Sequence, residues 1–360
     1  MTTSAPEFTY EVTRGFLPGH RACAGCGQAS AVRLVMEVAG PNVIVANATG
    51  CLEVFSTPHP ESAWGVPWVH SLFENHPAVA SGIEAALKVQ GKLDQTRVLC
   101  FGGDGSTLDI GFGALSGMFE RGHDVAYFCW DNEAYMNTGV QRSGSTPFAA
   151  ATTTSPAGRE SFGEDRPKKD LPAIAAAHGI PYVATASMSI FADLRRKAKK
   201  ALETRGPKYV QVHVPCPPGW GYDEKNSVEI GKLAVDCGLY PLVEWENGEV
   251  VRVRKIKPIP VEDYLKPQRR FRHLFRGETG KAQLAKIQEM ADANIKKYGL
   301  TDCERRRVEE SRSRRARPGQ AALFRVCAAE RTRAVRPKQD TASRRGNFLP
   351  NGDEGDRFRA

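Results

Sequence analysis

The sequence predicts an α/β fold built on a doubly wound, mostly parallel sheet of the diphosphate-binding type. Short apolar runs end in Gly, Asn, Asp or Pro, as buried parallel strands do, at residues 43–46, 98–101, 125–130 and 209–214. Stretches with apolar residues at helical spacing fall between or beside them, at residues 78–89, 108–120 and 190–202. This strand–turn–helix order predicts helices on both faces of one sheet.

The sequence divides into a body, an accessory region and a tail. Residues 1–221 hold the strand and helix pattern, and residues 222–300 contain a β-hairpin-like ribbon at 238–253 and helical stretches at 261–265 and 280–298. Residues 301–360 contain 15 Arg and one Lys against nine acidic residues, which is +7 of the net charge of +9. We expect this Ser-, Pro- and Gly-containing tail to be disordered.

Composition excludes several classes of function. With the basic charge confined to the tail, the body gives no electrostatic reason to bind nucleic acid. No run of 18 apolar residues occurs, and the first 14 residues contain Pro6, Glu7 and Glu11 where a signal peptide would be apolar. We therefore expect a cytoplasmic protein without a membrane partner. At 360 residues the chain is large enough for an enzyme core.

The most informative motif is Gly103-Asp104-Gly105 with Asn132 following 28 residues after the aspartate. Both polar residues come directly after a predicted strand, so they should meet at the carboxyl edge of the sheet, where ligands bind in such folds. Carboxylate and amide oxygens suit Mg²⁺, and the glycines let the backbone approach a phosphate. Gly-Asp-Gly alone is common in turns, but its pairing with Asn132 favours a metal and diphosphate site.

Four of the nine cysteines have the setting of metal ligands. Cys23 and Cys26 form a Cys-x-x-Cys turn, Cys51 follows Thr49-Gly50, and Cys216 lies in a Pro-Cys-Pro-Pro-Gly-Trp segment. From the spacing, structural zinc and an iron–sulfur cluster are equally compatible, because both accept four thiolates. A redox dithiol at Cys23 and Cys26 is a further alternative.

A long segment rich in Gly, Ser, Thr and Pro separates Asn137 from Lys169. Segments of this length without regular structure are uncommon in compact domains unless they are functional or disordered. Because it directly follows the Asn132 motif, we expect it to cover the active site.

Taken together, these motifs give a family resemblance over roughly residues 16–270. The Gly-Asp-Gly to Asn pattern resembles the thiamine-diphosphate motif. The string from Asp131 to Thr146, with the Cys-x-x-Cys, Thr-Gly-Cys and Pro-Cys-Pro-Pro-Gly-Trp segments, closely resembles the β subunit of pyruvate:ferredoxin oxidoreductase, within the 2-oxoacid:ferredoxin oxidoreductase family.

The resemblance implies a role for each motif residue. Asp104, Asn132 and the Ala134 carbonyl would bind Mg²⁺, and Gly103, Gly105 and Ser106 would lie against the diphosphate of thiamine diphosphate. Asn137 would face the thiazolium ring and the 2-oxo acid, and Gln28 would touch the cofactor unless it is a turn or surface residue. Cys23, Cys26, Cys51 and Cys216 would ligate one [4Fe-4S] cluster, with Cys51 also beside the cofactor.

The implied activity is that of an oxidoreductase subunit. Pyruvate and coenzyme A would give acetyl-CoA and CO₂, and electrons would pass through the cluster to ferredoxin. A redox-inert zinc ion would not serve this chemistry, which favours the iron–sulfur alternative. The resemblance also implies a hetero-oligomer, because an α subunit must supply a glutamate at the aminopyrimidine and a ferredoxin-like subunit or domain is absent from this sequence.

Two alternatives remain open on the sequence. The substrate could be a branched-chain 2-oxo acid or oxalate in a related ferredoxin oxidoreductase. The chain could also be a non-redox thiamine-diphosphate decarboxylase whose cysteines hold structural zinc.

Overall fold

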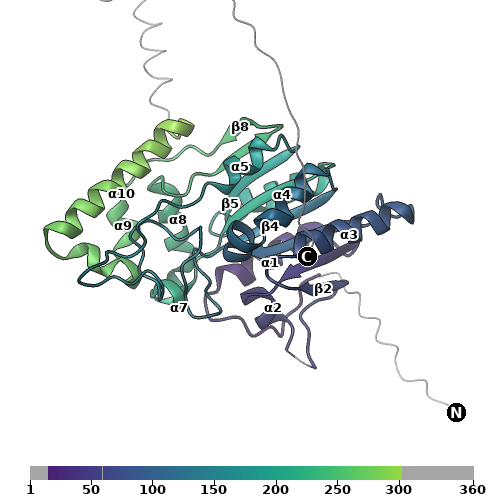
Figure 1. Cartoon of the computed structure of the whole chain (residues 1–360), viewed down its shortest axis with the longest axis horizontal. Coiled ribbons are helices and arrows are strands. Elements are labelled where there is room, and N and C mark those ends of the chain that lie inside the picture. The colour runs from purple at the N-terminus through teal and green to yellow at the C-terminus, as the bar shows by residue number, and fades with distance from the viewer. Residues whose placement is uncertain (1–14, 59, 302–360) are drawn as a thin grey trace, which may run out of the picture. The chain divides into compact units, whose positions relative to one another are not determined.

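A computed structural model of the chain describes residues 15–58 and 60–301. Its strands are β1 Val43–Ala48, β2 Trp68–Ser71, β3 Arg97–Gly103, β4 Val125–Asp131, β5 Tyr182–Ser187, β6 Lys208–His213, β7 Val243–Glu246 and β8 Glu249–Val253. They form one sheet in the order β2-β1-β3-β4-β6-β5-β7-β8 (Figure 1). The first six in this order pair in parallel, and β7 and β8 are antiparallel. The predicted mostly parallel sheet is confirmed.

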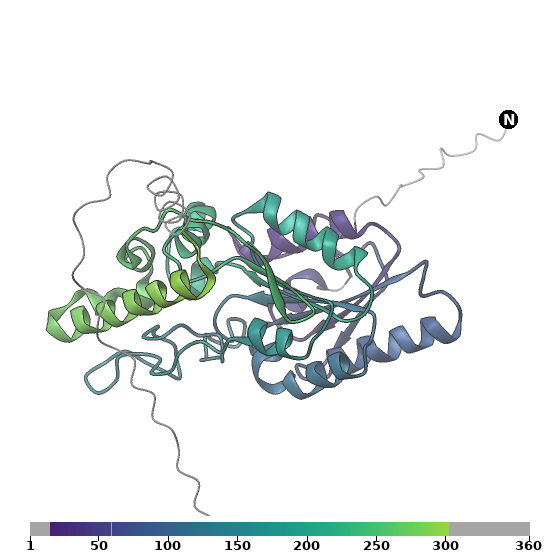
Figure 2. The ribbon, with the colours of Figure 1, turned by 90° about the horizontal axis from the view of Figure 1, so that it is seen from above.

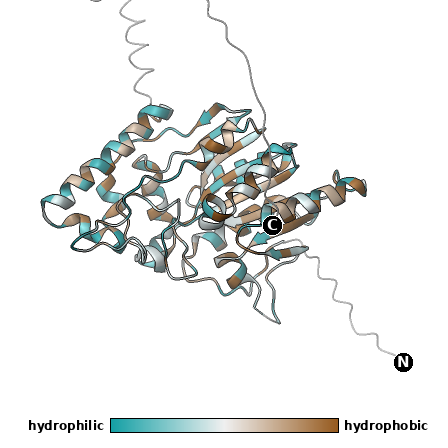
Figure 3. Ribbon diagram, viewed as in Figure 1, coloured by the Kyte–Doolittle hydropathy of each residue, from teal (hydrophilic) through white to brown (hydrophobic). Residues whose placement is uncertain are grey.

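Helices cover both faces of the sheet (Figure 2). One face packs against α1 (Gly27–Ala39), α2 (Cys51–Ser56) and α6 (Phe191–Glu203), and the other against α3 (His76–Val89), α4 (Phe112–Glu120) and α5 (Leu171–Ala177). Successive residues of a strand enter opposite apolar clusters, so Leu99 and Phe101 pack on the first face and Val98 and Cys100 on the second. This two-sided burial explains why the central strands are continuous apolar runs; Figure 3 shows the hydropathy along the ribbon.

The structure refines one expected helix and adds elements that the sequence did not predict. The stretch predicted as helical from residue 108 begins earlier, as a π-helical turn at Gly105–Ile110 followed by α4. The helical amides therefore begin directly after Asp104. The elements that were not expected include α1, α2, α5, β2 and β5. The predicted strands and helices are present, with ends shifted by no more than a few residues.

The predicted ribbon at 238–253 is confirmed as the β7–β8 hairpin. Its turn is Asn247-Gly248, with both residues at positive φ (51° and 88°), which suits the twist of a two-residue hairpin. Strand β7 also pairs with β5, so the ribbon extends the main sheet. The buried Glu244 carboxylate anchors it by accepting hydrogen bonds from Tyr182 Oη at 2.8 Å and Arg196 Nη2 at 2.7 Å.

Residues 222–300, here called the C-terminal arm, complete the described chain with its own apolar cluster. Before the hairpin, the arm contains η2 (Glu224–Asn226) and α8 (Ser227–Asp236). After the hairpin come α9 (Val261–Leu265), the 3₁₀-helix η3 (Arg269–Phe275) and α10 (Gly277–Tyr298). The helices predicted at 261–265 and 280–298 are confirmed. The functional division at residue 221 stays a prediction, and the predicted disordered tail lies, from residue 302 onward, outside the described residues.

Among the described helices, none is both long enough and apolar enough to cross a membrane. The chain leaves β1 for β2 on one side and then returns to β3 on the other, which makes the carboxyl ends of β1 and β3 a topological switch point. In open α/β sheets this point is where ligands bind.

Candidate functional site

A groove at the switch point brings together every residue predicted to bind the cofactor. It is formed by the loops that follow β1, β3 and β4. Its lining includes Cys51, Gly103, Asp104, Gly105, Ser106, Asn132, Ala134 and Asn137. The convergence of these residues follows from the parallel sheet, because the carboxyl ends of β1, β3 and β4 lie at one edge.

Three oxygen-bearing groups meet at the centre of this groove. The Asn132 side-chain oxygen lies 2.9 Å from the Ala134 carbonyl oxygen and 2.9 Å from Asp104 Oδ1. With the amide reversed, its nitrogen would donate hydrogen bonds to both oxygens, so the orientation depends on what faces it. Adjacent ligands of an octahedral ion with bonds of 2.0–2.1 Å are separated by about 2.9 Å. The observed spacing therefore fits three neighbouring oxygen ligands of Mg²⁺.

A strained turn sets this geometry. Glu133, between Asn132 and Ala134, has φ of 69°, which a residue with a side chain adopts at a cost of about 1–2 kcal/mol. Thr146 Oγ1 donates a hydrogen bond of 2.8 Å to the Glu133 carbonyl. The Trp220 indole donates one of 2.8 Å to the Asn132 carbonyl. The turn is therefore held at its backbone by side chains distant in sequence.

Two cations, the half-buried Lys168 and the buried Arg270, hold the acidic side chains of the same turn. Lys168 Nζ lies 2.7 Å from Asp131 Oδ2 and 3.1 Å from Glu133 Oε1, and Arg270 Nη2 lies 2.6 Å from Glu133 Oε2. Burial alone would raise the pKa of Glu133, but Lys168 and Arg270 outweigh it and lower the pKa to about 2. Burial lowers the pKa of the neighbouring His213 to about 4, so its ring is neutral.

The Asp104 carboxylate, unlike those of Asp131 and Glu133, has no cation beside it in the part of the chain that the structure describes. Ser143 Oγ donates it a hydrogen bond of 2.5 Å, but within residues 15–58 and 60–301 no Lys or Arg forms an ion pair with it. Burial, followed by the nearby Asp131 carboxylate, raises the pKa of Asp104 well above its ordinary value. A divalent cation between the three oxygens would supply the missing positive charge.

The two glycines beside Asp104 face different surroundings. A Cβ built on Gly103 would meet no atom within 4 Å, so the groove is open at this position. A Cβ on Gly105 would lie 2.3 Å from the Tyr135 ring, so this glycine is required by packing. The Ser106 hydroxyl donates a hydrogen bond of 2.9 Å to the Gly103 carbonyl. This bond fixes the Ser106 side chain against the backbone of the same turn.

Asn137 and Gln28 both line the groove, but Asn137 is exposed to solvent and Gln28 is buried. Asn137 is exposed at its rim. Gln28, on α1, is 4% exposed, and its Oε1 has no hydrogen-bond partner among the described residues. A buried, unpartnered acceptor in the lining fits a polar ligand, which supports the prediction that Gln28 touches the cofactor.

The four predicted cysteine ligands lie near one another beside the groove. The Cys-x-x-Cys turn precedes α1, Cys51 begins α2, and Cys216 precedes α7 (Pro217–Trp220). The Gly27 amide donates to the Pro215 carbonyl at 3.1 Å, which joins the turn to the Cys216 segment. Gly25 has φ of 68°, and a Cβ there would lie 2.4 Å from the Glu224 carbonyl, so only glycine fits this approach.

Electrostatics and spacing both bear on what these thiols could hold. Burial, followed by the other thiols of the group, raises the pKa of Cys51, and burial raises that of Cys216 to about 12. Thiolates here would therefore need the positive charge of bound metal. The described residues contain no group of three or more Cys, His, Asp or Glu side chains compact enough for a metal ion.

The segment between Asn137 and Lys169 packs against the acidic edge. Ser145 Oγ donates to Asp131 Oδ1 at 2.6 Å, in addition to the Ser143 contact with Asp104. Arg142 pairs with the buried Glu164 at 2.8 Å, and this ion pair joins the two ends of the segment. Its expected role as an active-site cover stays a prediction, but its serines hold the carboxylates of Asp104 and Asp131.

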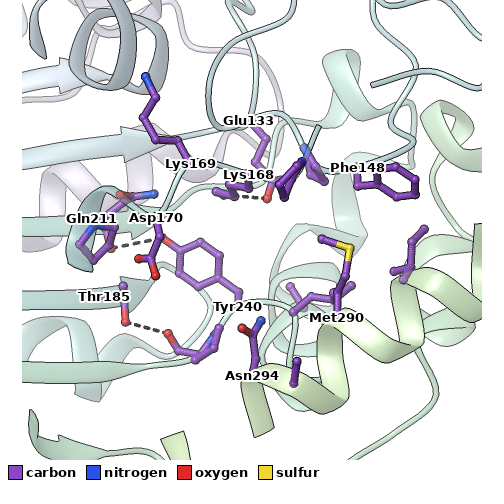
Figure 4. Close-up of a pocket in the computed structure, with 18 of the residues that line it drawn as sticks. Glu133, Phe148, Lys168, Lys169, Asp170, Thr185, Gln211, Tyr240, Met290 and Asn294 are labelled. Carbon is purple, nitrogen blue, oxygen red and sulfur yellow. Dashed lines mark hydrogen bonds and ion pairs between the residues drawn. The ribbon is translucent and has the colours of Figure 1, made fainter. Parts of the chain in front are cut away.

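A second cavity of about 360 Å³ lies between the sheet and the C-terminal arm (Figure 4). Apolar side chains form most of its wall, and its polar groups bond to protein: Thr185 Oγ1 donates to the Pro241 carbonyl and Asn294 Nδ2 to the Gly238 carbonyl. Glu133 and Lys168 border it, but none of the three converging oxygen ligands does. We therefore place the chemistry in the groove.

Sequence reasoning missed the supporting residues of the site. Lys168, Arg270 and His213 carry no local motif, and Arg270 is 137 positions from its partner Glu133. Of the supporting residues, Trp220 alone lies in a motif that the sequence analysis singled out, because the Pro-Cys-Pro-Pro-Gly-Trp segment ends on it.

Comparisons with known proteins identify the family of the chain. Residues 48–212 match the family model described as thiamine pyrophosphate enzyme, C-terminal TPP binding domain. Pyruvate synthase subunit PorB of Methanosarcina barkeri is 61% identical over 283 residues, which cover 78% of this chain and 96% of that protein. Ketoisovalerate oxidoreductase subunit VorB of Pyrococcus furiosus is 46% identical over 266 residues, covering 72% and 86%. The solved 2-oxoglutarate:ferredoxin oxidoreductase from Magnetococcus marinus is 22% identical with a TM-score of 0.49, covering 61% and 79%.

Arg270→Met is expected to lower the free energy of unfolding by about 3–5 kcal/mol, because it leaves the buried Glu133 carboxylate without its closest cation. Urea unfolding followed by circular dichroism measures the loss. Arg272→Met is the matched control, since Arg272 is exposed on the same 3₁₀-helix and should change stability by less than about 0.5 kcal/mol. Equal effects of the two substitutions would contradict the assigned role of the Glu133 pair.

Proposed function

The chain belongs to the family of thiamine-diphosphate-dependent 2-oxoacid:ferredoxin oxidoreductase β subunits that includes pyruvate synthase subunit PorB, and we propose that it binds the cofactor for pyruvate oxidation. It acts within a complex of several subunits. The reaction converts pyruvate and coenzyme A to acetyl-CoA and CO₂, and two electrons pass to ferredoxin. Identity of 61% and 56% to PorB proteins, against 46% to a VorB protein, favours pyruvate over a branched-chain substrate.

The observation that carries this proposal is the meeting of three oxygens at 2.9 Å spacing in the groove. Asp104 Oδ1, the Asn132 side-chain oxygen and the Ala134 carbonyl hold Mg²⁺, which binds the diphosphate. When bound, thiamine diphosphate supplies the electron sink for the negative charge left by decarboxylation. The open space at Gly103 accepts the diphosphate, and Asn137 at the rim faces the 2-oxo acid.

A [4Fe-4S] cluster held by Cys23, Cys26, Cys51 and Cys216 is the electron acceptor in this proposal. Two observations support it: the thiols are mutual neighbours, and burial raises the pKa values of Cys26, Cys51 and Cys216.

Partner chains complete the site. The groove encloses a volume of only about 40 Å³, against roughly 300–1,000 Å³ for a typical small-molecule site. This chain therefore supplies one wall for the cofactor. An α subunit contributes the remaining wall and the glutamate at the aminopyrimidine, and a ferredoxin-like subunit or ferredoxin itself takes the electrons.

Asp104→Ala tests the proposed reaction. In the complex assembled with its partner subunits, this variant should lose roughly 100-fold or more of the anaerobic viologen reduction that depends on pyruvate and coenzyme A. The visible absorption of the cluster should remain, because Asp104 is not a cluster ligand. Activity of the variant with an unchanged Mg²⁺ requirement would show that the metal is bound elsewhere.

Gly103→Ala tests whether the diphosphate occupies the open space in the groove. The added methyl group meets no protein atom within 4 Å, so the variant should fold normally. We expect its dissociation constant for thiamine diphosphate to rise at least about tenfold, by calorimetric titration of the complex. Gly113→Ala is the control, since it is equally free of contacts but lies on α4 outside the groove. Unchanged affinity in Gly103→Ala would place the diphosphate elsewhere.

Cys216→Ala tests the cluster. Iron content measured by mass spectrometry should fall well below that of the unmodified chain, with loss of the brown colour. Cys237→Ala, which removes a buried thiol outside the proposed group, should keep its iron. Colourless protein with stoichiometric zinc would favour the non-redox decarboxylase instead.

A further inference from the structure

The cavity between the sheet and the C-terminal arm, here called the arm cavity, has the size of a ligand site. Its volume of about 360 Å³ falls within the range of roughly 300–1,000 Å³ that small-molecule sites occupy. Packed interiors rarely hold voids larger than a water molecule, so a space of this size is unusual as a packing defect. Cavities with mostly apolar walls are also poor sites for water, which needs several polar partners.

Aromatic side chains provide much of the wall of the arm cavity. Figure 4 shows two of them, Tyr240 and Phe148, at opposite sides of the space. Aromatic rings favour offset and edge-on contacts with other rings. The wall therefore suits a flat aromatic ligand. The aromatic residues that line the cavity are Phe148, Tyr240, Trp245, Tyr264, Phe271 and Tyr298.

The charged side chains that line the arm cavity are two acids and two bases, and each has a partner of opposite charge. The pairs are Glu133–Lys168 at 3.1 Å, Lys169–Asp109 at 3.4 Å and Asp170–Lys297 at 3.0 Å. A charged ligand would lose its hydration here without gaining a free counter-charge, which is unfavourable. The cavity therefore favours an uncharged ligand.

One polar group of the wall is free to orient such a ligand. Asn294, on α10, donates a hydrogen bond of 3.1 Å from Nδ2 to the Gly238 carbonyl, but among the described residues its Oδ1 accepts none. By contrast, Thr185 Oγ1 donates to the Pro241 carbonyl, and Gln211 Nε2 donates to Asp131. The free amide oxygen of Asn294 suits a ligand with one hydroxyl or N–H donor.

The arm cavity and the cofactor groove lie on the two sides of one turn. Glu133 lines the cavity, and its chain neighbours Asn132 and Ala134 line the groove. Lys168, which pairs with Glu133, lies 4.9 Å from the centre of the Tyr240 ring in the cavity wall. A ligand packed against Tyr240 would therefore support the turn from the side that faces away from the groove.

We propose that the arm cavity is an effector site for a small, uncharged aromatic molecule with one hydrogen-bond donor, and that its occupant tightens cofactor binding in the groove. The effect on the cofactor rests on the proposed function, whereas the ligand site itself does not. Glu133 is held at a φ of 69° by the packing around it, so filling the space behind it favours the conformation that presents Asn132 and Ala134 to the groove. By linkage, the cofactor raises the affinity for the effector by the same factor.

Calorimetric titration of the complete complex with 2-naphthol tests the proposal. This probe is an uncharged aromatic molecule with one hydroxyl donor, and we expect saturable binding with a dissociation constant below roughly 100 μM. At saturating 2-naphthol, the dissociation constant for thiamine diphosphate with Mg²⁺ should fall about fivefold. The anion 2-naphthoate has the same rings and should bind at least about tenfold more weakly than 2-naphthol, because it finds no free cation.

Substitutions on α10 locate the probe. Met290→Trp fills the cavity from a half-buried position and Ala293→Phe narrows it from an exposed one, so each should weaken 2-naphthol binding at least about tenfold. Ala285→Phe is the matched control, since Ala285 is exposed on the same helix but outside the cavity, and it should change the affinity by less than about twofold. Asn294→Leu should weaken 2-naphthol about fivefold and leave the affinity for 2-methoxynaphthalene, which has no donor, unchanged.

Several results would overturn the proposal. No saturable binding of 2-naphthol, tighter binding of 2-naphthoate, or equal losses in Ala285→Phe and Ala293→Phe would exclude the ligand site. Competition between 2-naphthol and thiamine diphosphate would place the probe in the groove, and an unchanged affinity for the cofactor would refute the effector role. Failure of the proposed function is distinguishable, because the unmodified complex would then not bind thiamine diphosphate with or without the probe, while calorimetry would still record the binding of 2-naphthol.

Discussion

The site depends on how three buried carboxylates are kept at one edge of the sheet. Asp104, Asp131 and Glu133 all lie within the interior, where an uncompensated charge is costly. Lys168 contacts Asp131 and Glu133, and Arg270 contacts Glu133. Asp104 has a hydroxyl hydrogen bond in place of a cation. The fixed cations thus satisfy two carboxylates and leave the third, Asp104, without an ion pair among the described residues.

The cations and hydroxyls that support this edge come from segments outside the strands that carry the ligands. Lys168 and Ser143 belong to the long segment after β4, and Arg270 to the C-terminal arm. Groups behind a metal ligand fix its orientation and tune its affinity. The long segment and the arm therefore hold the turn at Glu133 in place, and the arm is more than an addition to the sheet.

The sequence was informative where a function rests on short-range patterns. The strands before Asp104 and Asn132 are continuous apolar runs, so their common edge and the convergence of both residues could be predicted. Strand β5 was missed because its Thr185 and Ser187 interrupt the apolar run, and both are buried among hydrogen bonds. Arg270 could not be predicted as a partner of Glu133, because an ion pair across 137 positions leaves no local pattern. The early helical start at Gly105 reflects the Gly-Asp-Gly turn more than apolar periodicity.

A continuous chain of contacts joins the turn at Glu133 to the segment that follows Cys216. Trp220 donates to the Asn132 carbonyl and stacks against Arg270, which pairs with Glu133 of the same turn. The same tryptophan ends the short helix that begins after Cys216. One packed unit thus sets the positions of Asn132, Glu133 and the Cys216 segment relative to each other. Because packed interiors resist deformation, we expect these residues to keep their relative positions.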